Sequence, residues 1–147
     1  MFKNILIPTD GSVRSRKALK AGVKLAQAIG AKVTGYHGVQ ALRPELFGDG
    51  DLIKKDTVDL LDEQARSVGE RYLAEIAKAA TAAGVVYAGL ITNAPTAYEG
   101  IIDAAKKKRC DAIFLSSRGR GELKSLLLGS VTQKVLAHAK VPVIVYR

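Results

Sequence analysis

Short apolar runs alternate with longer amphipathic stretches along the whole chain. A short apolar run is typical of a strand buried on both faces, whereas apolar residues three and four positions apart indicate one face of a helix. The first pattern predicts five strands: Ile5–Pro8, Lys32–Gly38, Val85–Ile91, Asp111–Ser116 and Val141–Tyr146. The second predicts four helices: Ser12 or Ser15 to about Ile29, Thr57–Ala83, a helix opening at Pro95–Glu99 and ending in Lys106–Arg109, and Ser130–Ala139.

The ends of several elements carry their own signals. Gly30 and Gly84 follow two of the helices, and glycine readily takes the left-handed conformation that ends a helix. Thr96 and Glu99 have the spacing of a capping box. The stretch from Val39 to about Asp56 is rich in glycine, proline and aspartate and is long for a compact domain, which indicates either a lid or a partly disordered segment.

The alternation of strands and helices predicts an α/β fold. Such a chain forms a parallel sheet with right-handed crossovers and helices on both faces. The sequence shows no internal repeat and no linker, so residues 1–147 are expected to form a single domain. Ligands of these sheets bind beyond the carboxyl ends of the strands, where the strand order reverses.

Composition narrows the class of protein. With 48% hydrophobic and 25% charged residues, the chain has the composition of a globular protein. No apolar run is long enough to span a membrane and no secretory signal precedes the first strand, so a cytoplasmic protein is expected. Cys110 is the only cysteine, which excludes an internal disulfide; the basic run before it would favour a reactive thiol, and an incidental thiol is the simpler interpretation.

Positive charge is concentrated in one part of the chain. The net charge is +9, and the segment from Gly11 to Pro44 contains basic residues but no acidic one. Such a surface attracts phosphate-bearing partners, although a solvated helix face gives the same pattern. A nucleic-acid-binding protein is not indicated, because aromatic residues are only 5% of the chain and no known binding module is present.

The strongest candidate for a ligand site is the stretch from Leu115 to Gly119, followed after nine residues by Gly129 and Ser130. It leaves a predicted buried strand and feeds a predicted helix, so free N–H groups and the positive end of the helix dipole converge there and favour an anion. Ser130 has capping-box spacing to Gln133, so its hydroxyl is expected to cap the helix, to face a phosphate, or both.

The charged residues near this loop each have more than one interpretation. Asp10 follows the first strand, where its carboxylate can accept hydrogen bonds from ribose hydroxyls or hold Mg²⁺ through water. Alternatively, Asp10 and Gly11 form an ordinary Asp-Gly turn. Arg118 and Arg120 can each pair with a phosphate or extend into solvent. His37 and His138 have no partner at metal-ligand spacing and are expected to be structural, so we expect neither a catalytic set nor a protein-built metal site.

Other nucleotide motifs are absent. The chain lacks the Gly-x-x-x-x-Gly-Lys pattern of a P-loop, and Lys124 stands where a dinucleotide-binding fold needs its third glycine.

Three segments together resemble the universal stress protein family over essentially the whole chain: Pro8-Thr9-Asp10-Gly11-Ser12, the spacing Gly119-x9-Gly129-Ser130, and Val141-Pro142-Val143-Ile144-Val145. The resemblance implies a Rossmann-like fold of the adenine nucleotide alpha hydrolase type, with strand order 3-2-1-4-5 and a crevice between strands one and four. It implies a regulator of the stress response that binds ATP or a related adenine nucleotide, with Mg²⁺ expected beside ATP. Some members hydrolyse ATP slowly, so any enzyme activity is expected to be that of a weak ATPase at most.

Carried over residue by residue, the resemblance places the following residues around the nucleotide: Pro8, Thr9, Asp10, Gly38, Leu115, Ser116, Arg118, Gly119, Gly129, Ser130 and Val131. Two of them depart from the pattern of the nucleotide-binding members. Ser116 replaces a glycine that lies near the ribose and triphosphate, and Gly38 replaces an apolar residue whose backbone and side chain contact adenine. These departures motivate the alternative function of a nucleotide-free dimeric scaffold or partner-binding protein.

The last predicted strand suggests how two copies would associate. In the implied strand order Val141–Tyr146 lies at an edge of the sheet, and it is apolar. An apolar edge strand readily pairs with another chain, so we expect a homodimer through this strand.

Overall fold

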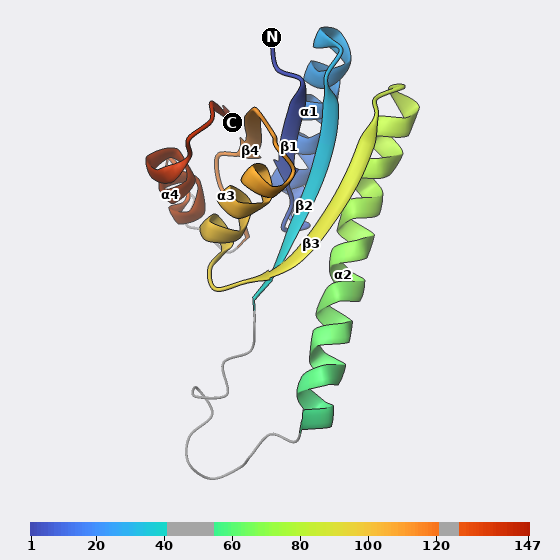
Figure 1. Ribbon diagram of the computed structural model, residues 1–147, viewed down its shortest axis with the longest axis vertical. Helices are drawn as coiled ribbons and strands as arrows, with labels where there is room; N and C mark the ends of the chain where they lie inside the picture. The colour runs from blue at the N-terminus through green and yellow to red at the C-terminus, as the bar shows by residue number, and fades with distance from the viewer. Residues whose placement is uncertain (41–54, 121–126) are drawn as a thin grey trace.

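A five-stranded parallel sheet forms the centre of the molecule (Figure 1). The structure, a computed structural model, describes residues 1–40, 55–120 and 127–147. Its strands are β1 (Asn4–Pro8), β2 (Lys32–Gln40), β3 (Tyr87–Ala94), β4 (Ala112–Ser116) and β5 (Val143–Tyr146). Their order in the sheet is β3-β2-β1-β4-β5, which confirms the expected α/β fold and strand order.

Two layers of helices cover the sheet. The helices are α1 (Val13–Ile29), α2 (Lys55–Ala82), α3 (Ala97–Lys107) and α4 (Ser130–His138). Buried residues of α1 and α2 pack with Ile5 and Ile7 on one face, whereas those of α3 and α4 pack with Leu6 on the other. Successive β1 side chains point to opposite faces of the sheet, and both faces are buried, so the residues in the middle of the strand, Ile5, Leu6 and Ile7, are all apolar.

The junction between β1 and β4 is short. Only Ile5–Ala112 and Leu6–Ile113 are paired along it within the described residues, whereas β2 and β3 are paired from Val33–Tyr87 to Gln40–Ala94. Below the ladder the Asp111 N–H donates to the Asn4 carbonyl at 3.0 Å. Beyond the carboxyl end of the ladder the two strands diverge: β1 leads to α1 on one face of the sheet, and β4 leads to α4 on the other.

Side-chain caps begin two of the helices as the sequence predicts. Of the two candidates for α1, Ser12 is the cap, since its Oγ accepts the Ser15 N–H at 3.1 Å. In α3 the Thr96 Oγ accepts the Glu99 N–H at 3.4 Å and donates to the Glu99 carboxylate at 2.6 Å.

The predicted cap of α4 is wrong. Gly129 occupies the N-cap position, and Ser130 is already the first helical residue. The Gln133 side chain donates to the Leu128 carbonyl at 3.0 Å instead of closing a capping box. Glycine is tolerated as an N-cap, and the Gly129 carbonyl receives the first helical bond from the Gln133 N–H at 2.9 Å.

Some predicted boundaries are shifted. β3 runs from Tyr87 to Ala94, whereas the apolar run had suggested Val85–Ile91. Val85 belongs to the turn that ends α2, because its N–H donates to the Ala80 carbonyl at 2.9 Å and Gly84 has a φ of 67°. Most of the predicted lid or disordered stretch after Val39 lies outside the described residues; its two ends belong to β2 and α2.

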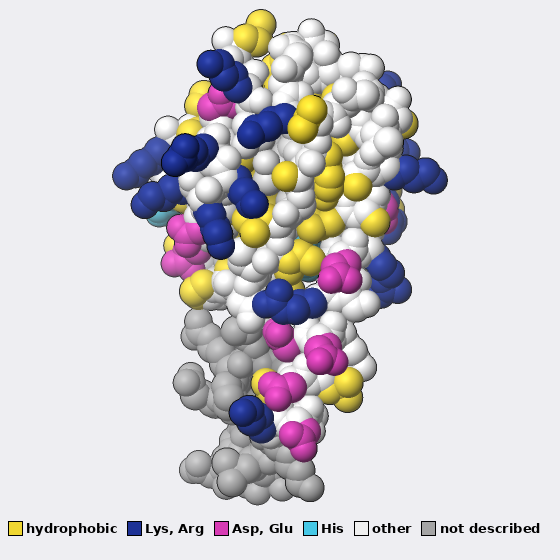
Figure 2. All heavy atoms as spheres, turned by 45° about the vertical axis from the view of Figure 1, so that its right-hand side comes forward, with side chains coloured by type: hydrophobic (Ala, Val, Ile, Leu, Met, Phe, Trp, Pro, Cys, Tyr) yellow, Lys and Arg dark blue, Asp and Glu magenta, His cyan; other side chains and the backbone are white. Residues whose placement is uncertain are grey.

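The exposed faces of α1 and α2 differ in charge. Lys17, Lys20 and Lys24 are exposed along α1, which is the arrangement of a solvated helix face. Acidic side chains gather over the first half of α2, which extends beyond the sheet (Figures 1 and 2). Among the described residues, no helix is both long enough and apolar enough to cross a membrane.

Candidate functional site

A pocket opens where β1 and β4 diverge, at the carboxyl ends of the strands. Its volume is about 140 Å³. The lining residues come from the ends of β1, β2 and β4 and from the first turns of three helices: Pro8, Thr9, Asp10, Ser15, Tyr36, His37, Gly38, Ala97, Ile101, Leu115, Ser116, Arg118, Gly119, Val131 and Thr132. This is the position at which open α/β sheets bind their ligands.

Most of the predicted site residues meet at this pocket. Those that line it are Pro8, Thr9, Asp10, Gly38, Leu115, Ser116, Arg118, Gly119 and Val131. Gly129 and Ser130 are not among its lining residues. Gly129 is buried and its N–H donates to the Ser117 carbonyl at 2.7 Å, while Ser130 is exposed at the start of α4. Gly129 therefore ties the start of α4 to the loop after β4 without facing the pocket.

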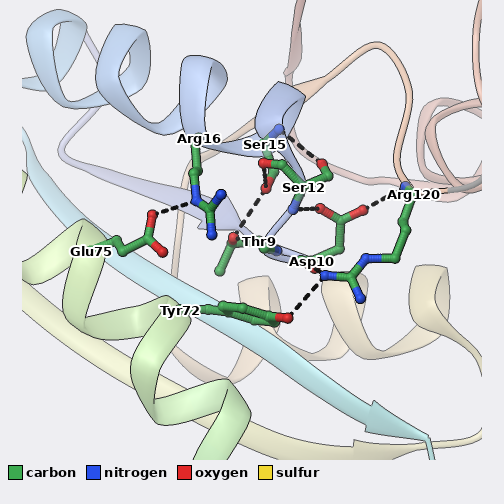
Figure 3. Close-up of polar contacts among 9 residues, drawn as sticks. Thr9, Asp10, Ser12, Ser15, Arg16, Tyr72, Glu75 and Arg120 are labelled. Carbon is green, nitrogen blue, oxygen red and sulfur yellow. Dashed lines mark hydrogen bonds and ion pairs between the residues drawn. The ribbon is translucent and has the colours of Figure 1, made fainter.

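Asp10 lies at the mouth of the pocket with its carboxylate held by two backbone groups (Figure 3). One oxygen accepts the Ser12 N–H at 2.9 Å, as in an Asx-turn, and the other accepts the Arg120 N–H at 2.8 Å. Burial alone would raise the Asp10 pKa, but hydrogen bonds from Ser12, Ser15 and Arg120 outweigh it and leave the pKa below its ordinary value. The carboxylate is therefore ionised at neutral pH.

Thr9 joins β1 to β2 and to α1 beneath the pocket. Its N–H donates to the Tyr36 carbonyl at 2.9 Å, and its carbonyl lies 2.8 Å from His37 Nδ1. The Thr9 hydroxyl accepts the Gly11 N–H at 3.2 Å and lies 3.2 Å from the Ser15 hydroxyl. These bonds fix the turn that presents Asp10.

A tyrosine from α2 covers the same turn. Gly11 has a φ of 73°, and a Cβ there would overlap the Tyr72 ring. The Tyr72 hydroxyl accepts a bond from Arg120 Nη2 at 2.9 Å, and the same nitrogen donates to the Asp10 carbonyl at 3.2 Å (Figure 3). From the sequence we expected Arg120 to pair with a phosphate or to extend into solvent, whereas its guanidinium bonds to Asp10 and Tyr72.

The two departures from the family pattern have local explanations. The Ser116 hydroxyl donates to the Arg118 carbonyl at 2.8 Å, so it is engaged within the loop. The Thr132 hydroxyl in turn donates to the Ser116 carbonyl at 3.0 Å and ties the loop to α4. At Gly38 a Cβ would lie 2.9 Å from the Tyr36 hydroxyl, which is closer than real Cβ contacts come.

The predicted set omitted six of the lining residues: Ser15, Tyr36, His37, Ala97, Ile101 and Thr132. Tyr36 and His37 directly precede Gly38 in β2, so their position beside a predicted site residue could have indicated that they line the pocket. Ala97 and Ile101 come from the first turns of α3, and nothing in the sequence indicates that α3 reaches across to β1.

Both histidines contact other groups of the protein, and the cysteine is buried. The His37 ring meets Tyr72 edge-on at a centroid distance of 5.4 Å, and His138 Nδ1 lies 2.8 Å from the Lys134 carbonyl of its own helix. Cys110 is buried, and burial raises its pKa, which disfavours the reactive thiolate.

The described residues include no group of three or more histidine, cysteine or acidic residues able to hold a metal. Asp10 is the one acidic residue among those that line the pocket. Mg²⁺ keeps most of its water and is commonly bound through one or two carboxylates and the phosphates of a ligand. The donor set therefore fits a magnesium ion that arrives with a phosphate ligand, and does not fit a metal held by the protein alone.

Fold and site together define an α/β protein with a ligand pocket at the switch point of its parallel sheet. A family model described as the universal stress protein family matches residues 1–147, and the chain belongs to this family.

Similar proteins match this chain over its full length. The chain is 32% identical to the universal stress protein YxiE of Bacillus subtilis, with 100% of both sequences covered. It is 30% identical to the universal stress protein MJ0531 of Methanocaldococcus jannaschii, with 100% of this chain and 83% of that protein covered.

Solved structures share the fold. The structure of MJ0577 from M. jannaschii superposes with a TM-score of 0.83 at 26% identity, covering 99% of this chain and 95% of that one. A universal stress protein in complex with cAMP gives a TM-score of 0.73 at 20% identity and covers 99% and 97% of the two chains. A universal stress protein from Archaeoglobus fulgidus in complex with dAMP gives 0.63 at 20% identity and covers 99% and 98%.

Proposed function

We propose that this protein binds an adenine nucleotide, ATP with Mg²⁺, in the pocket between β1 and β4 and acts through it as a regulator of the stress response. The observation that carries the proposal is the pocket itself, which joins an apolar inner end, an ionised carboxylate and a glycine loop ahead of a helix. The cAMP and dAMP complexes of two proteins with the same fold support an adenine ligand.

The lining residues divide the pocket by chemistry. Tyr36, Ala97, Ile101 and Leu115 give one end an apolar character suited to a base. Asp10 can accept hydrogen bonds from the ribose hydroxyls in addition to its two backbone bonds, since a carboxylate oxygen accepts more than one hydrogen bond. The loop at Arg118 and Gly119, ahead of the N-terminus of α4, offers positive charge and helix dipole to the phosphates.

Gly119 is needed for this arrangement. A Cβ at this position would lie 2.8 Å from the Asp10 carboxylate. Any larger side chain would therefore displace the carboxylate or the loop. Magnesium bound to the phosphates would supply charge neutralisation, and Asp10, the acidic residue of the pocket lining, would hold it through water.

Catalysis is expected to be slow. Efficient hydrolysis needs a group free to activate water. The lowered pKa of Asp10 makes its carboxylate a weak base, and His37 Nδ1 is engaged with the Thr9 carbonyl. We therefore expect binding to be the function, with ATPase activity weak at most.

Isothermal titration with ATP and Mg²⁺ tests the proposal. The wild-type protein, dialysed and checked for carried-over nucleotide, is compared with Asp10→Ala and Gly119→Val; Asp59→Ala, an exposed carboxylate on α2, is the matched control. We expect the wild type and the control to bind and both pocket variants to lose about tenfold or more in affinity. A folded wild type that binds no adenine nucleotide would contradict the proposal and favour the nucleotide-free scaffold.

We also propose that two copies associate through β5. Val143–Tyr146 is an edge strand in the sheet, shorter than the sequence suggested, and it carries no charged side chain. Unpaired edge groups of this kind pair readily with a second strand. Sedimentation at micromolar concentration is expected to show a dimer that Val145→Lys and Ile144→Pro dissociate; a wild-type monomer would remove the proposal.

A further inference from the structure

Basic side chains gather at the end of the sheet where the strands begin, opposite to the pocket. They precede β1 and β2 and follow the last turns of α3, and together they form the basic end of the molecule: Lys3, Lys32, Lys106, Lys107, Lys108 and Arg109. All are exposed except Lys108, which is half-buried. Lys and Arg side chains accordingly lie mainly over the upper part of Figure 2, the end at which Figure 1 shows the N-terminus.

Hydrogen bonds between the elements hold the basic end together. The Lys32 N–H donates to the Lys3 carbonyl at 3.0 Å. The buried Asn4 side chain donates to the Lys108 carbonyl at 3.0 Å and accepts from the Thr34 hydroxyl at 3.0 Å. The fold, and not one segment of the chain, therefore places these cations side by side.

Little negative charge lies among them. Asp111 is close by, but its carboxylate accepts the Lys3 N–H at 2.8 Å and the Asn4 N–H at 2.9 Å. The ion pairs printed for the described residues, Arg16–Glu75 and Arg66–Asp62, lie elsewhere. The basic end therefore presents a positive potential that attracts an anionic surface.

Helix termini do not explain this concentration of charge. Cations are favourable near the C-terminus of a helix, yet the last turns of α1 and α2 contain no basic residue. Both helices end at the same side of the molecule, because Gly30 and Gly84 line a hollow there with Lys3 and Lys32. These two lysines precede strands and have no helix end to neutralise.

Arg109 occupies a position at which glycine is usual. Its φ is 51°, and the residues that follow α1 and α2 in the same left-handed conformation are Gly30 and Gly84, at 69° and 67°. A residue with a Cβ is strained in this conformation, whereas glycine is not. The chain thus keeps a cation at the basic end where glycine would fold with less strain, and such strain points to a function.

Two apolar side chains project among the cations. Met1 is 94% exposed and Val86 is 71% exposed. Val86 lines the same hollow as Lys3 and Lys32, and Met1 lies two residues before Lys3. Exposed aliphatic side chains beside basic ones match the boundary between lipid headgroups and acyl chains, whereas the phosphates of a nucleic acid offer them no apolar surface.

We infer that the basic end docks on a membrane surface that carries anionic lipids. The lysines and Arg109 bind the headgroups, and Met1 and Val86 enter the headgroup boundary. Each basic side chain near such a surface raises the affinity roughly fivefold. The inference does not rest on the proposed function, because the pocket lies at the opposite end of the strands and stays open when the basic end is docked.

Cosedimentation with vesicles tests the inference. The vesicles contain phosphatidylcholine alone, or equal parts of phosphatidylcholine and phosphatidylglycerol, and both are used at low and at raised salt. The wild type is compared with a triple variant of the basic end, Lys3→Gln with Lys32→Gln and Lys107→Gln. The matched control removes the same charge from the half of α1 nearer the pocket: Arg14→Gln with Lys17→Gln and Lys20→Gln.

The wild type is expected to bind only the vesicles with phosphatidylglycerol, and less tightly as salt is added. The triple variant of the basic end is expected to lose about a hundredfold in affinity, and the control less than about fivefold. Equal losses in the two triple variants would show that net charge alone attracts the lipid and would overturn the inference. A folded wild type that does not bind the anionic vesicles would also overturn it.

Two single variants make the test specific. Arg109→Gly is expected to bind the anionic vesicles about fivefold more weakly and yet to unfold at a urea concentration at least as high as the wild type, because glycine relieves the strain. An unchanged affinity in Arg109→Gly would contradict its assigned role. Val86→Ser is expected to weaken vesicle binding about threefold. Tighter binding to duplex DNA than to the vesicles, with no effect of Val86→Ser on either, would overturn the membrane as the partner.

Discussion

The residues around Tyr36 show how one hydroxyl group constrains several positions. Once the oxygen is removed, the nearest Tyr36 atoms to a Cβ on Gly38 are ring carbons at 3.5 and 3.6 Å, which is ordinary contact. The strain at residue 38 therefore comes from the hydroxyl and not from the ring.

A double-mutant cycle follows from these distances. Gly38→Ala is expected to destabilise the wild type by about 1–2 kcal/mol through overpacking, and to cost much less in the Tyr36→Phe background. Chemical denaturation of the four proteins measures the coupling. Equal costs of Gly38→Ala in both backgrounds would contradict the geometry.

The lowered pKa of Asp10 predicts a dependence of stability on pH. A carboxyl whose pKa is lower in the folded protein than its ordinary value of 3.8 stabilises the fold while it is ionised in both states. The wild type is therefore expected to be more stable than Asp10→Asn near neutral pH. This advantage should shrink as the pH falls below about 3.8, because the unfolded chain then takes up a proton that the folded protein does not. It should be lost once the pH has also fallen through the lower pKa of the folded protein.

Urea unfolding of both proteins between about pH 7 and pH 2 measures this difference. The comparison with Asp10→Asn removes the contribution of Asp111, whose pKa is also lowered despite burial, by the Asn4 and Lys3 N–H groups. A stability difference that does not change with pH would show that the Asp10 charge contributes nothing.

At the scale of single residues, the ends of β1 and β4 were predicted well, because turn-forming residues follow both strands closely. Tyr36 was missed because a tyrosine inside an apolar strand has the same pattern as any core residue. The space for its hydroxyl depends on Gly100, 64 positions away in the chain, and sequence periodicity carries no such long-range information.

Among the elements, α3 depends most visibly on its cap. Thr96 both accepts from the Glu99 N–H and donates to the Glu99 carboxylate. Thr96→Ala is expected to lower the free energy of unfolding by about 1 kcal/mol, whereas Thr96→Ser keeps a hydroxyl and is expected to cost less than about half of that. Thermal and urea unfolding of both variants test this; equal losses would mean that the methyl group, and not the cap, matters.

Within residues 1–40, 55–120 and 127–147 the elements were predicted in kind and number, but their ends less accurately. Helices that end at glycine were located to within a residue or so, because the left-handed conformation is local. The shift of β3 could not be foreseen, since the start of that strand is set by its partner, β2, and not by its own apolar run. The start of α4 could not be foreseen either, because it is set by the hydrogen bond from the Gly129 N–H to the Ser117 carbonyl, which lies outside the helix.

For the molecule as a whole, ligand binding is expected to raise thermal stability. A ligand that binds only the folded state at 100 times its dissociation constant stabilises it by about 2.7 kcal/mol. For a domain of this size that corresponds to a rise in Tm of roughly 5–10 °C. Scanning calorimetry with ATP and Mg²⁺ measures the shift; Gly119→Val should show little of it, and an equal shift in that variant would place binding elsewhere.

The overall architecture was the most predictable level. Strands buried on both faces that alternate with amphipathic helices are compatible with few folds, and the right-handedness of crossovers between parallel strands leaves fewer still. The order of the strands came from the family resemblance, because parallel strands buried on both faces are too alike in composition for the sequence to say which are neighbours.

The short ladder between β1 and β4 has a consequence for how the molecule opens. It divides the sheet into two halves, the one built around β2 and β3 and the other around β4 and β5, and the pocket is lined from both. A ligand held there spans the division as a removable cross-link. Amide hydrogens of Leu6 and Ile113 should therefore exchange with solvent more slowly in the occupied protein, and the lifetime of the molecule against proteolysis would report how much nucleotide the cell contains.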